Sequence, residues 1–449
     1  MVWTVLRRFR RVILCLVVVA GLLGAGAVVR LDSVHPAQAR TARLTQTTAA
    51  VGRISAARTP DESGHWVATW GAAPQAATPG NLSLVGFQDQ TVRQIVFVSG
   101  GGSMVRIELS NTFGSTALEV GGASVALDAS GADAQPGTTR ALTFAGQSSV
   151  VIPPGAEVLS DPVPLTVPAL SRLAVSLYLP VATGPVTQHV QARQVNYVAG
   201  GDRVLQDGPV GFDTQTHSWY LLAGVDVLAP ARDAGTIVAL GDSITDGVGS
   251  TLDGDDRWPN DLAERLAALT GTTMSVVDEG IGGNRVLNDS ACCGVDAVAR
   301  FERDVAAQPG VRDVILLEGI NDIGFSQSDK LDNEPHTDVS ALQIIDGYEQ
   351  IIAMAHADGL KIYGATLTPF AGARYWTPAG EAKRDAINRW IETSGAFNGV
   401  INFAAAVADP NDPEELDPAY DSGDHLHPNA AGYRAMAKAI DLAMLVPGH

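Results

Sequence analysis

The feature that most constrains the fold is a change in the pattern of apolar residues near residues 231–235. From Trp66 to about Pro230, short runs rich in β-branched residues are separated by Gly, Pro, Asp and Asn turns. After Ala234, apolar runs of strand length alternate with helical stretches. The first pattern predicts an all-β sandwich or jelly roll, and the second predicts a parallel sheet with helices on both faces. We therefore expect a β domain over 65–233 and an α/β domain over 234–449.

The apolar runs also predict the individual elements. Strands are expected at 91–98, 104–109, 117–127, 148–152, 173–179 and 219–227 in the first region. In the second region, they are expected at 236–240, 274–277, 311–317, 361–367 and 400–403. Helices are expected at 261–269, 294–307, 340–357, 378–393 and 429–445. Trp258, just before the first of these helices, is expected in the core.

The amino-terminal segment is expected to direct export of the protein and not to form part of a folded domain. Arginines at 7, 8, 10 and 11 precede the apolar stretch 12–29, and Ala37-Gln38-Ala39 has the small residues of a cleavage site. Residues 1–39 thus have the pattern of a signal peptide, although an uncleaved signal anchor over 12–29 fits as well. Residues 40–64 lack apolar periodicity and indicate a linker. In both cases we expect an extracytoplasmic protein, secreted or anchored by residues 12–29.

The net charge narrows the choice of partners. The formal net charge is −19 at pH 7, with a pI near 4.8. A surface of this kind repels nucleic acid and anionic lipid headgroups. We therefore expect no nucleic-acid partner, and contact with a membrane only through an amino-terminal anchor.

The sequence gives no reason to expect a metal ion or cofactor. The adjacent cysteines Cys292 and Cys293 cannot form a zinc site alone, and they either form a vicinal disulfide or stay buried and reduced. We expect them to have a structural role. The acidic segment 409–424 does not have the ligand spacing of a calcium loop, so a solvated loop is expected there.

A candidate nucleophile follows the first strand of the second region. The run Thr236–Leu240 leads into Gly241-Asp242-Ser243-Ile244-Thr245-Asp246-Gly247, which predicts a buried strand that delivers Ser243 to a turn. Asp242 is expected to hold that turn. A serine hydroxyl needs a base to become a nucleophile, and a serine at a helix start is also a common cap. Other stretches must decide between these two interpretations.

Three later stretches supply the missing groups. Gly280-Ile281-Gly282-Gly283-Asn284 and Glu318-Gly319-Ile320-Asn321-Asp322 each follow an expected strand, where a backbone N–H or an Asn amide can stabilise an oxyanion. Taken alone, each is explained equally well by an ordinary turn. Asp421-Ser422-Gly423-Asp424-His425-Leu426-His427 places an Asp three residues before a His, which suits an orienting carboxylate and a base. This spacing selects His427 over His425, for which solvent exposure or packing is expected.

With these four blocks in order, the segment from about 235 to 446 resembles the SGNH hydrolases, also called the GDSL esterase/lipase family. The resemblance implies a flavodoxin-like, three-layer α/β/α domain with a parallel sheet and no cofactor. It implies Ser243 as nucleophile, His427 as base and Asp424 as the orienting acid. The oxyanion donors would be the backbone of Ser243 and Gly283 and the side chain of Asn321.

The preceding β region is similar to the amino-terminal domain of secreted actinobacterial members of this family. The similarity lies in Val92-Arg93-Gln94-Ile95, Ser110-Asn111-Thr112-Phe113-Gly114 and Ser160-Asp161-Pro162. It implies no defined chemistry. The region is either a packing partner, or a carbohydrate-binding or substrate-shaping module with His189, Asn111 or an aromatic residue facing the serine.

The expected function is that of an exported serine esterase. It would hydrolyse short-chain acyl esters or acetylated glycans through an acyl-enzyme on Ser243. The alternatives are an acyltransferase with the same triad, or a lysophospholipase or lipase. A non-enzymatic alternative is a polysaccharide- or envelope-binding protein with a vestigial site.

Overall fold

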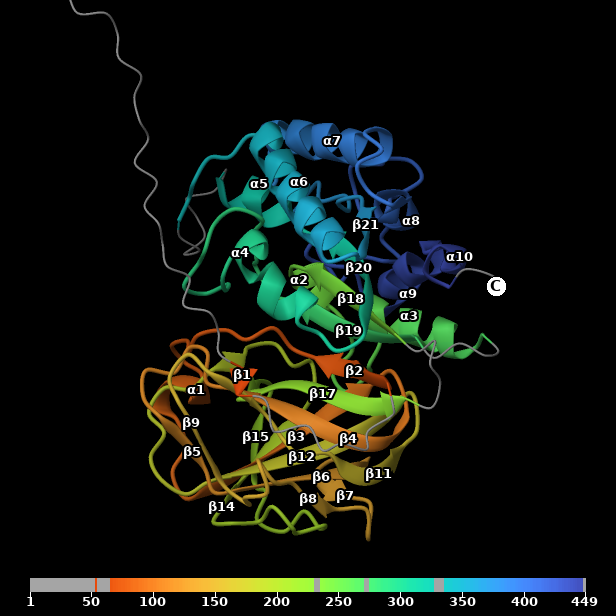
Figure 1. Ribbon diagram of the computed structural model, residues 1–449. Helices are drawn as coiled ribbons and strands as arrows, with labels where there is room; N and C mark the ends of the chain where they lie inside the picture. The colour runs from red at the N-terminus through yellow and green to blue at the C-terminus, as the bar shows by residue number, and fades with distance from the viewer. Residues whose placement is uncertain (1–52, 55–64, 230–234, 270–273, 327–334, 447–449) are drawn as a thin grey trace, which may run out of the picture. The chain divides into compact units, whose positions relative to one another are not determined.

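The computed structural model describes residues 53–54, 65–229, 235–269, 274–326 and 335–446 (Figure 1). The predicted signal segment and nearly all of the predicted linker lie outside the described residues. Residues 50–449 form one compact unit. Within the described part of the chain, no helix is both long and apolar enough to cross a bilayer.

The first region is all-β and consists mainly of two sheets (Figure 1). One has the order β1-β10-β4-β17-β2, with β11 beside β4, and the other has the order β15-β14-β3-β12-β6-β7, with β8 beside β6. Apolar side chains from both sheets, such as Val105 in β4 and Val96 in β3, belong to one hydrophobic cluster. The prediction of an all-β region is therefore confirmed.

The strands of this region range from two to nine residues. The first sheet contains β1 (Arg53–Ile54), β2 (His65–Gly71), β4 (Gly102–Ser110), β10 (Glu157–Leu159), β11 (Val163–Val167) and β17 (Leu222–Ala229). The second contains β3 (Gln90–Val98), β6 (Gly122–Ser130), β7 (Asp133–Ala134), β8 (Arg140–Ala141), β12 (Ser171–Leu179), β14 (Asn196–Gly200) and β15 (Thr214–Thr216). Smaller elements are β5 (Leu118–Val120) paired with β9 (Val150–Ile152), β13 (Gln188–His189) paired with β16 (Trp219–Tyr220), and α1 (Leu82–Val85).

Two expected strands of this region are each divided in two. The run 117–127 forms β5 and β6, which change partners at Gly121, where a Cβ atom would lie 3.0 Å from the Tyr178 ring. The run 219–227 forms β16 and β17, because Leu221 has a positive φ of 63°. Neither break interrupts the apolar pattern, so the sequence predicted continuous strands.

The second region is built on a parallel sheet with the order β19-β18-β20-β21-β22. Its strands are β18 (Gly235–Gly241), β19 (Met274–Gly280), β20 (Val311–Leu317), β21 (Lys361–Ala365) and β22 (Gly399–Ile401). Counted along the chain, the spatial order is 2-1-3-4-5, as in flavodoxin-like folds. The carboxyl ends of β19, β18 and β20 are neighbours, and ligands bind at such a switch point. Ser243, Gly283 and Asn321 follow β18, β19 and β20, respectively.

The helices of this region are mostly those that the sequence predicts. They are α2 (Ser243–Asp246), α3 (Trp258–Ala267), α4 (Ala297–Phe301) continued by the π-helical η1 (Glu302–Ala306), α5 (Ile320–Ser326), α6 (Ala341–Ala357), α7 (Pro378–Thr393), α8 (Phe403–Val407), α9 (Ala430–Ala439) and α10 (Leu442–Leu445). Helix α3 begins earlier than expected because Pro259 suits a first turn. The expected helix 429–445 is interrupted at Ile440, whose ψ of 119° is extended. Trp258 is fully buried, which confirms its expected place in the core.

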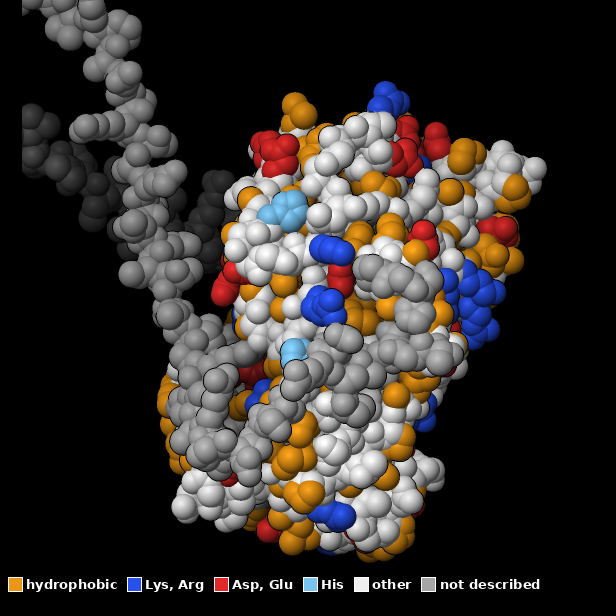
Figure 2. Space-filling model, turned by 45° about the vertical axis from the view of Figure 1, so that its right-hand side comes forward, with side chains coloured by type: hydrophobic (Ala, Val, Ile, Leu, Met, Phe, Trp, Pro, Cys, Tyr) orange, Lys and Arg blue, Asp and Glu red, His pale blue; other side chains and the backbone are white. Residues whose placement is uncertain are grey.

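Hydrogen bonds connect the two regions. Ser99, at the end of β3, accepts from the backbone N–H of Val276 in β19 (2.9 Å). Thr236 in β18 donates its hydroxyl to Ala68 O in β2 (3.2 Å). On the face shown in Figure 2, acidic and basic side chains are interspersed. The net negative charge is therefore not gathered into one patch on that face.

Candidate active site

Ser243 lies at the turn between β18 and α2. Asp242 caps α2, because its side chain accepts a hydrogen bond from the backbone N–H of Ile244 (2.9 Å). A Cβ atom on Gly241 would lie 2.4 Å from Leu317 O, so only glycine fits between this turn and β20. Asp242 therefore holds the turn that carries Ser243.

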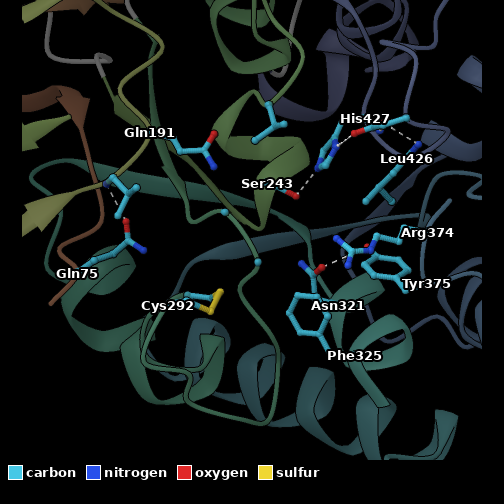
Figure 3. A pocket seen from close by; sticks show the side chains of 16 residues that line it. Gln75, Gln191, Ser243, Cys292, Asn321, Phe325, Arg374, Tyr375, Leu426 and His427 are labelled. Carbon is cyan, nitrogen blue, oxygen red and sulfur yellow. Dashed lines mark hydrogen bonds and ion pairs between the residues drawn. A yellow bond between two sulfur atoms is a disulfide. The ribbon is translucent and has the colours of Figure 1, made fainter. Parts of the chain in front are cut away.

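His427 and Asp424 come from the loop before α9 and complete a line of hydrogen bonds with Ser243 (Figure 3). His427 Nε2 lies 2.8 Å from Ser243 Oγ, and His427 Nδ1 lies 2.6 Å from Asp424 Oδ2. Asp424 Oδ1 also accepts from the backbone N–H groups of Leu426 (3.0 Å) and His427 (2.9 Å). The structure thus brings together the three residues that the sequence selected.

The environment of Asp424 favours its ionised form. Burial tends to raise the pKa of its carboxyl, but the hydrogen bonds and charge of His427 outweigh burial and hold this pKa well below its ordinary value. An ionised Asp424 accepts the Nδ1 proton and leaves Nε2 free to accept from Ser243. The two bonds are consistent with that tautomer.

His425 has a different environment. Its Nδ1 lies 2.8 Å from Asp421 Oδ2, and 59% of its side chain is exposed. The structure therefore separates the two histidines of this loop, with His427 on the serine and His425 largely in solvent.

The residues of the three expected oxyanion donors, Ser243, Gly283 and Asn321, line one cavity. Gly283 has a φ of 78°, which suits glycine, and follows β19 on the loop 281–284, which we call the oxyanion loop. Within the described residues, the backbone N–H groups of Ser243 and Gly283 have no acceptor. Asn321 donates one amide hydrogen to Asn284 O (3.0 Å), which leaves its second hydrogen for another acceptor.

Tyr375 also lines the site, although no sequence motif indicates it. Its hydroxyl donates to Asn321 Oδ1 (3.2 Å), so it fixes which end of the amide faces the cavity. Tyr375 lies in the segment between β21 and α7 and packs edge-on against Phe325. That segment carries no motif around the tyrosine, so only the tertiary fold reveals this contact.

A cavity of about 500 Å³ opens next to Ser243. Gln75, Val190 and Gln191 of the β region form part of its wall (Figure 3). Phe325 and Leu426 contribute apolar surface. Both regions therefore shape the space in front of the serine.

Cys292 and Cys293 form a vicinal disulfide, and both line this cavity. The pair lies against the oxyanion loop: a Cβ atom on Gly283 would be 2.6 Å from Cys293 Sγ. Asn284 Nδ2 donates to Cys293 O (2.8 Å). Of the two states that the sequence allowed, the structure has the oxidised one.

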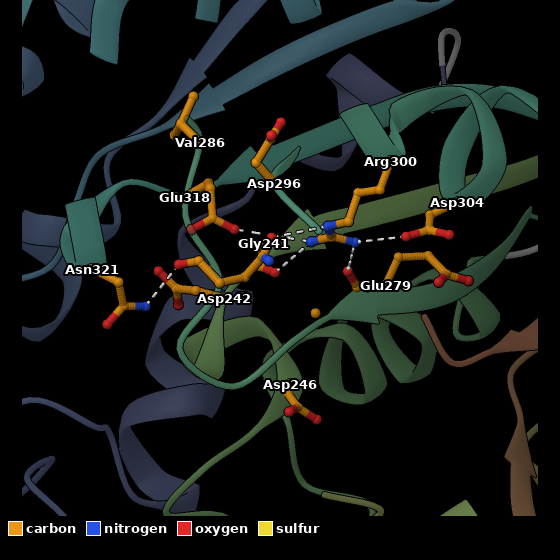
Figure 4. Close-up of polar contacts among 12 residues, drawn as sticks. Gly241, Asp242, Asp246, Glu279, Val286, Asp296, Arg300, Asp304, Glu318 and Asn321 are labelled. Carbon is orange, nitrogen blue, oxygen red and sulfur yellow. Dashed lines mark hydrogen bonds and ion pairs between the residues drawn. The ribbon is translucent and has the colours of Figure 1, made fainter. Parts of the chain in front are cut away.

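Arg300 lies behind the site and connects the ends of its strands (Figure 4). This buried guanidinium donates to Gly241 O (2.9 Å), Glu279 O (2.7 Å) and Asn284 Oδ1 (2.9 Å). Burial raises the pKa of Asp242 to about 7 and that of Glu318 well above its ordinary value, in each case against the opposing charge of Arg300. Arg300 thus fixes the turn before Ser243 and the residue after Gly283 in one network.

The two candidates named in the β region have different surroundings. Asn111 is buried, and its amide donates to the backbone at Thr116 O (2.9 Å) and Ile152 O (3.0 Å), away from the cavity. His189 is buried and contacts Asp246 in α2. Only His189 contacts an element of the site.

A serine, a histidine and an aspartate in this arrangement are typical of hydrolases that act through an acyl-enzyme. Residues 239–435 match the model of the GDSL-like Lipase/Acylhydrolase family, and this part of the chain belongs to that family. No curated protein sequence matches the chain.

Solved structures with similarity to part of the chain include three esterases or lipases. A GDSL-like lipase from Bacteroides thetaiotaomicron is 18% identical, over 48% of this chain and 90% of its own, with a TM-score of 0.35. A carbohydrate acetylesterase family member from Sinorhizobium meliloti is 17% identical, over 47% and 99%, with a TM-score of 0.37. An acetyl xylan esterase is 22% identical, over 45% and 96%, with a TM-score of 0.36.

Proposed function

We propose that the protein is an exported serine esterase in which Ser243, His427 and Asp424 form the catalytic triad. The observation that carries this proposal is the continuous line of hydrogen bonds from Asp424 Oδ2 through His427 to Ser243 Oγ, with distances of 2.6 and 2.8 Å. The base is within hydrogen-bond reach of both the nucleophile and the orienting acid, as covalent catalysis by serine requires.

The reaction would proceed through an acyl-enzyme. His427 Nε2 takes the Ser243 proton while Oγ attacks the ester carbonyl, and the resulting oxyanion accepts from Ser243 N, Gly283 N and Asn321 Nδ2. When the intermediate collapses, the ester C–O bond breaks and His427 returns the proton to the leaving alcohol. Water, deprotonated by His427, then attacks the acyl-enzyme, and the acid and free Ser243 are released.

The proposed substrates are soluble short-chain acyl esters or acetylated glycans. The cavity of about 500 Å³ has the size of a small-molecule site and combines apolar side chains with the polar Gln75 and Gln191. Rates on p-nitrophenyl esters from C2 to C16 should be highest for the shortest chains. Acetylated xylan tested alongside distinguishes a glycan esterase from a general one.

The decisive test of the mechanism is Ser243→Ala. We expect a loss of nearly all activity on p-nitrophenyl acetate and of labelling by a fluorophosphonate probe. A Ser243→Ala protein that hydrolyses the ester at the wild-type rate would remove Ser243 from the mechanism.

We also propose that the α/β region is a three-layer α/β/α domain over 234–449, which follows a β domain over 65–233 in the chain. Two groups of helices support the layers: α3 and α8 pack on α9, whereas α4 and α7 pack on α6. Groups of this kind correspond to the two helical layers that cover a parallel sheet.

Export is part of the proposal and rests on the arginines before the apolar stretch 12–29. The vicinal disulfide agrees with it, because disulfides persist in oxidising compartments. Amino-terminal sequencing of the mature protein should find Arg40 first, and an intact Met1 in a membrane fraction would indicate the anchor instead.

A further inference from the structure

His189 connects the β region to the helix that carries Ser243. It lies in β13, and its side chain is only 3% exposed. Its Nδ1 is 3.0 Å from Ala73 O, and its Nε2 is 3.1 Å from Asp246 Oδ1. Asp246 is the last residue of α2, which begins with Ser243. A buried contact therefore joins the two regions within one helical turn of the serine.

The two partners of His189 require both of its ring nitrogens to donate. A backbone carbonyl oxygen carries no hydrogen, and a carboxylate only accepts. With Asp246 ionised, both hydrogen bonds exist together only if His189 is an imidazolium. Burial tends to lower the pKa of His189, but the charge of Asp246 and both hydrogen bonds outweigh burial and raise this pKa.

Asp246 also contacts the oxyanion loop, and so connects His189 to it. Its second oxygen, Oδ2, accepts from the backbone N–H of Gly282 (3.0 Å). Its own backbone N–H donates to Asp242 O (2.9 Å), so the residue cannot shift without moving the turn that carries Ser243. Gly282 immediately precedes Gly283, a proposed oxyanion donor. The carboxylate thus holds Ser243 and Gly283 in a fixed relation to each other.

The charges around this pair make His189 hard to replace. Asp278 is half-buried near Asp246, and Arg257 lies 3.5 Å from Asp278 Oδ2 with its guanidinium over the Trp219 ring. Arg257 is therefore paired with Asp278. Among the ion pairs of the described residues, His189 is the only basic side chain that contacts the Asp246 carboxylate. Removing the charge of His189 leaves a buried carboxylate uncompensated, which is strongly unfavourable unless the site rearranges or takes up a proton.

We propose that His189 is a positioning residue for ester cleavage: through Asp246 it holds the oxyanion loop in place, and this makes the β region a working part of the active site. This inference rests on the proposed function of Ser243. A positioning role differs from a simple packing role in what it predicts. Loss of His189 should weaken stabilisation of the transition state and leave substrate binding unchanged.

The test compares His189→Gln with His217→Gln, a change at an exposed histidine of the same region. For His189→Gln we expect kcat on p-nitrophenyl acetate to fall about 10- to 100-fold, with KM within about twofold, because the oxyanion forms only in the transition state. Affinity for phenylboronic acid, whose serine adduct is tetrahedral, should fall in parallel. His217→Gln should match the wild type in all three measurements.

A double-mutant cycle with Asp246→Asn tests the route of the effect. If His189 acts through Asp246, the double variant should lose little more than the larger single loss, whereas losses that multiply would overturn the proposal. A folded His189→Gln protein with wild-type kcat would overturn it as well. If His189→Gln does not fold, Asp246→Asn replaces it in the test, because the asparagine still offers an acceptor to the backbone N–H of Gly282. The proposal then requires that Asp246→Asn lowers kcat and leaves KM unchanged. The Ser243→Ala variant separates the proposed role of Ser243 from that of His189. If Ser243→Ala is inactive and His189→Gln is fully active, only the role of His189 is refuted.

Discussion

The Tyr375 hydroxyl donates a hydrogen bond to Oδ1 of Asn321 across 3.2 Å. Asn321 is in turn tied through Nδ2 to Asn284 O, so both ends of its amide are fixed before substrate arrives. An oxyanion donor that is already oriented needs no reorganisation during the reaction. Tyr375 therefore orients a proposed oxyanion donor, although it does not come from any of the four motifs.

Tyr375→Phe removes this hydrogen bond and keeps the ring that packs on Phe325. We expect kcat to fall about 3- to 10-fold, as for a hydrogen bond worth about 1 kcal/mol. Asn321→Ala should cost about 100- to 1000-fold. In the Asn321→Ala background, Tyr375→Phe should have no further effect, and a full additional loss there would mean that Tyr375 acts on something other than Asn321.

The parts of this site that the sequence predicted are local in the chain. Asp424 and His427 are three residues apart on one loop, and Ser243 follows a strand whose apolar run is unmistakable. Gly283 and Asn321 follow β19 and β20, the strands on either side of β18 in one parallel sheet, whose carboxyl ends meet at one edge. Patterns of this kind depend on spacing and strand order, and both can be obtained from a sequence.

The remaining parts depend on contacts between distant segments. Tyr375 approaches Asn321 from another loop, and His189 reaches Asp246 only because the β region packs against α2. The division of 429–445 at Ile440 has the same origin, since Arg265 of α3 donates to Ile440 O (2.9 Å), an acceptor that a continuous helix would use itself. Apolar periodicity carries no information on such contacts.

Asp424→Asn should nearly abolish turnover while leaving the protein folded. An asparagine amide that donates towards Nδ1 would favour the tautomer with its proton on Nε2, which cannot accept from Ser243. We expect kcat to fall about 10³- to 10⁴-fold. His425→Gln, on the same loop but 59% exposed, serves as the matched control and should stay within about threefold of the wild type. A rate for Asp424→Asn above one tenth of the wild-type rate would assign the orienting role elsewhere.

Reduction of the Cys292–Cys293 disulfide should slow the enzyme. The pair lies against Gly283 and is hydrogen bonded to Asn284, so separating the two sulfurs moves the oxyanion loop. Displacements on the scale of 1 Å can cost up to about 100-fold, and we expect about a 10-fold loss of kcat in dithiothreitol that is recovered on reoxidation. The Cys292→Ser/Cys293→Ser double variant is the control. It should be slow from the start and unaffected by the reductant, whereas wild-type activity that is insensitive to complete reduction would show that the disulfide does not support the loop.

The buried Asp322 should make folding stability depend on pH. Burial raises the pKa of its carboxyl to about 7, although the backbone N–H groups of Val286 (2.8 Å) and Leu287 (3.2 Å) donate to it. In the unfolded chain the pKa of an Asp is about 3.9. Between these two values the folded protein keeps a proton that the unfolded chain has released, so the free energy of unfolding falls as the pH rises from about 4 to about 7.

Asp322→Asn removes this titration. The variant should be less stable at pH 5, because its amide cannot accept from both backbone N–H groups, but its stability should fall less steeply towards pH 8. Between pH 5 and pH 8, the loss of stability should differ between the two proteins by at most about 3 kcal/mol, since about two pH units separate pH 5 from the folded pKa. Some decline should remain, because burial also raises the pKa of Asp242 to about 7 and that of Asp278 to about 6. Urea unfolding at pH 5 and pH 8 measures the slope, with the exposed Asp346→Asn as control. Equal slopes for Asp322→Asn and the wild type would mean that Asp322 is already ionised in the folded protein at pH 5.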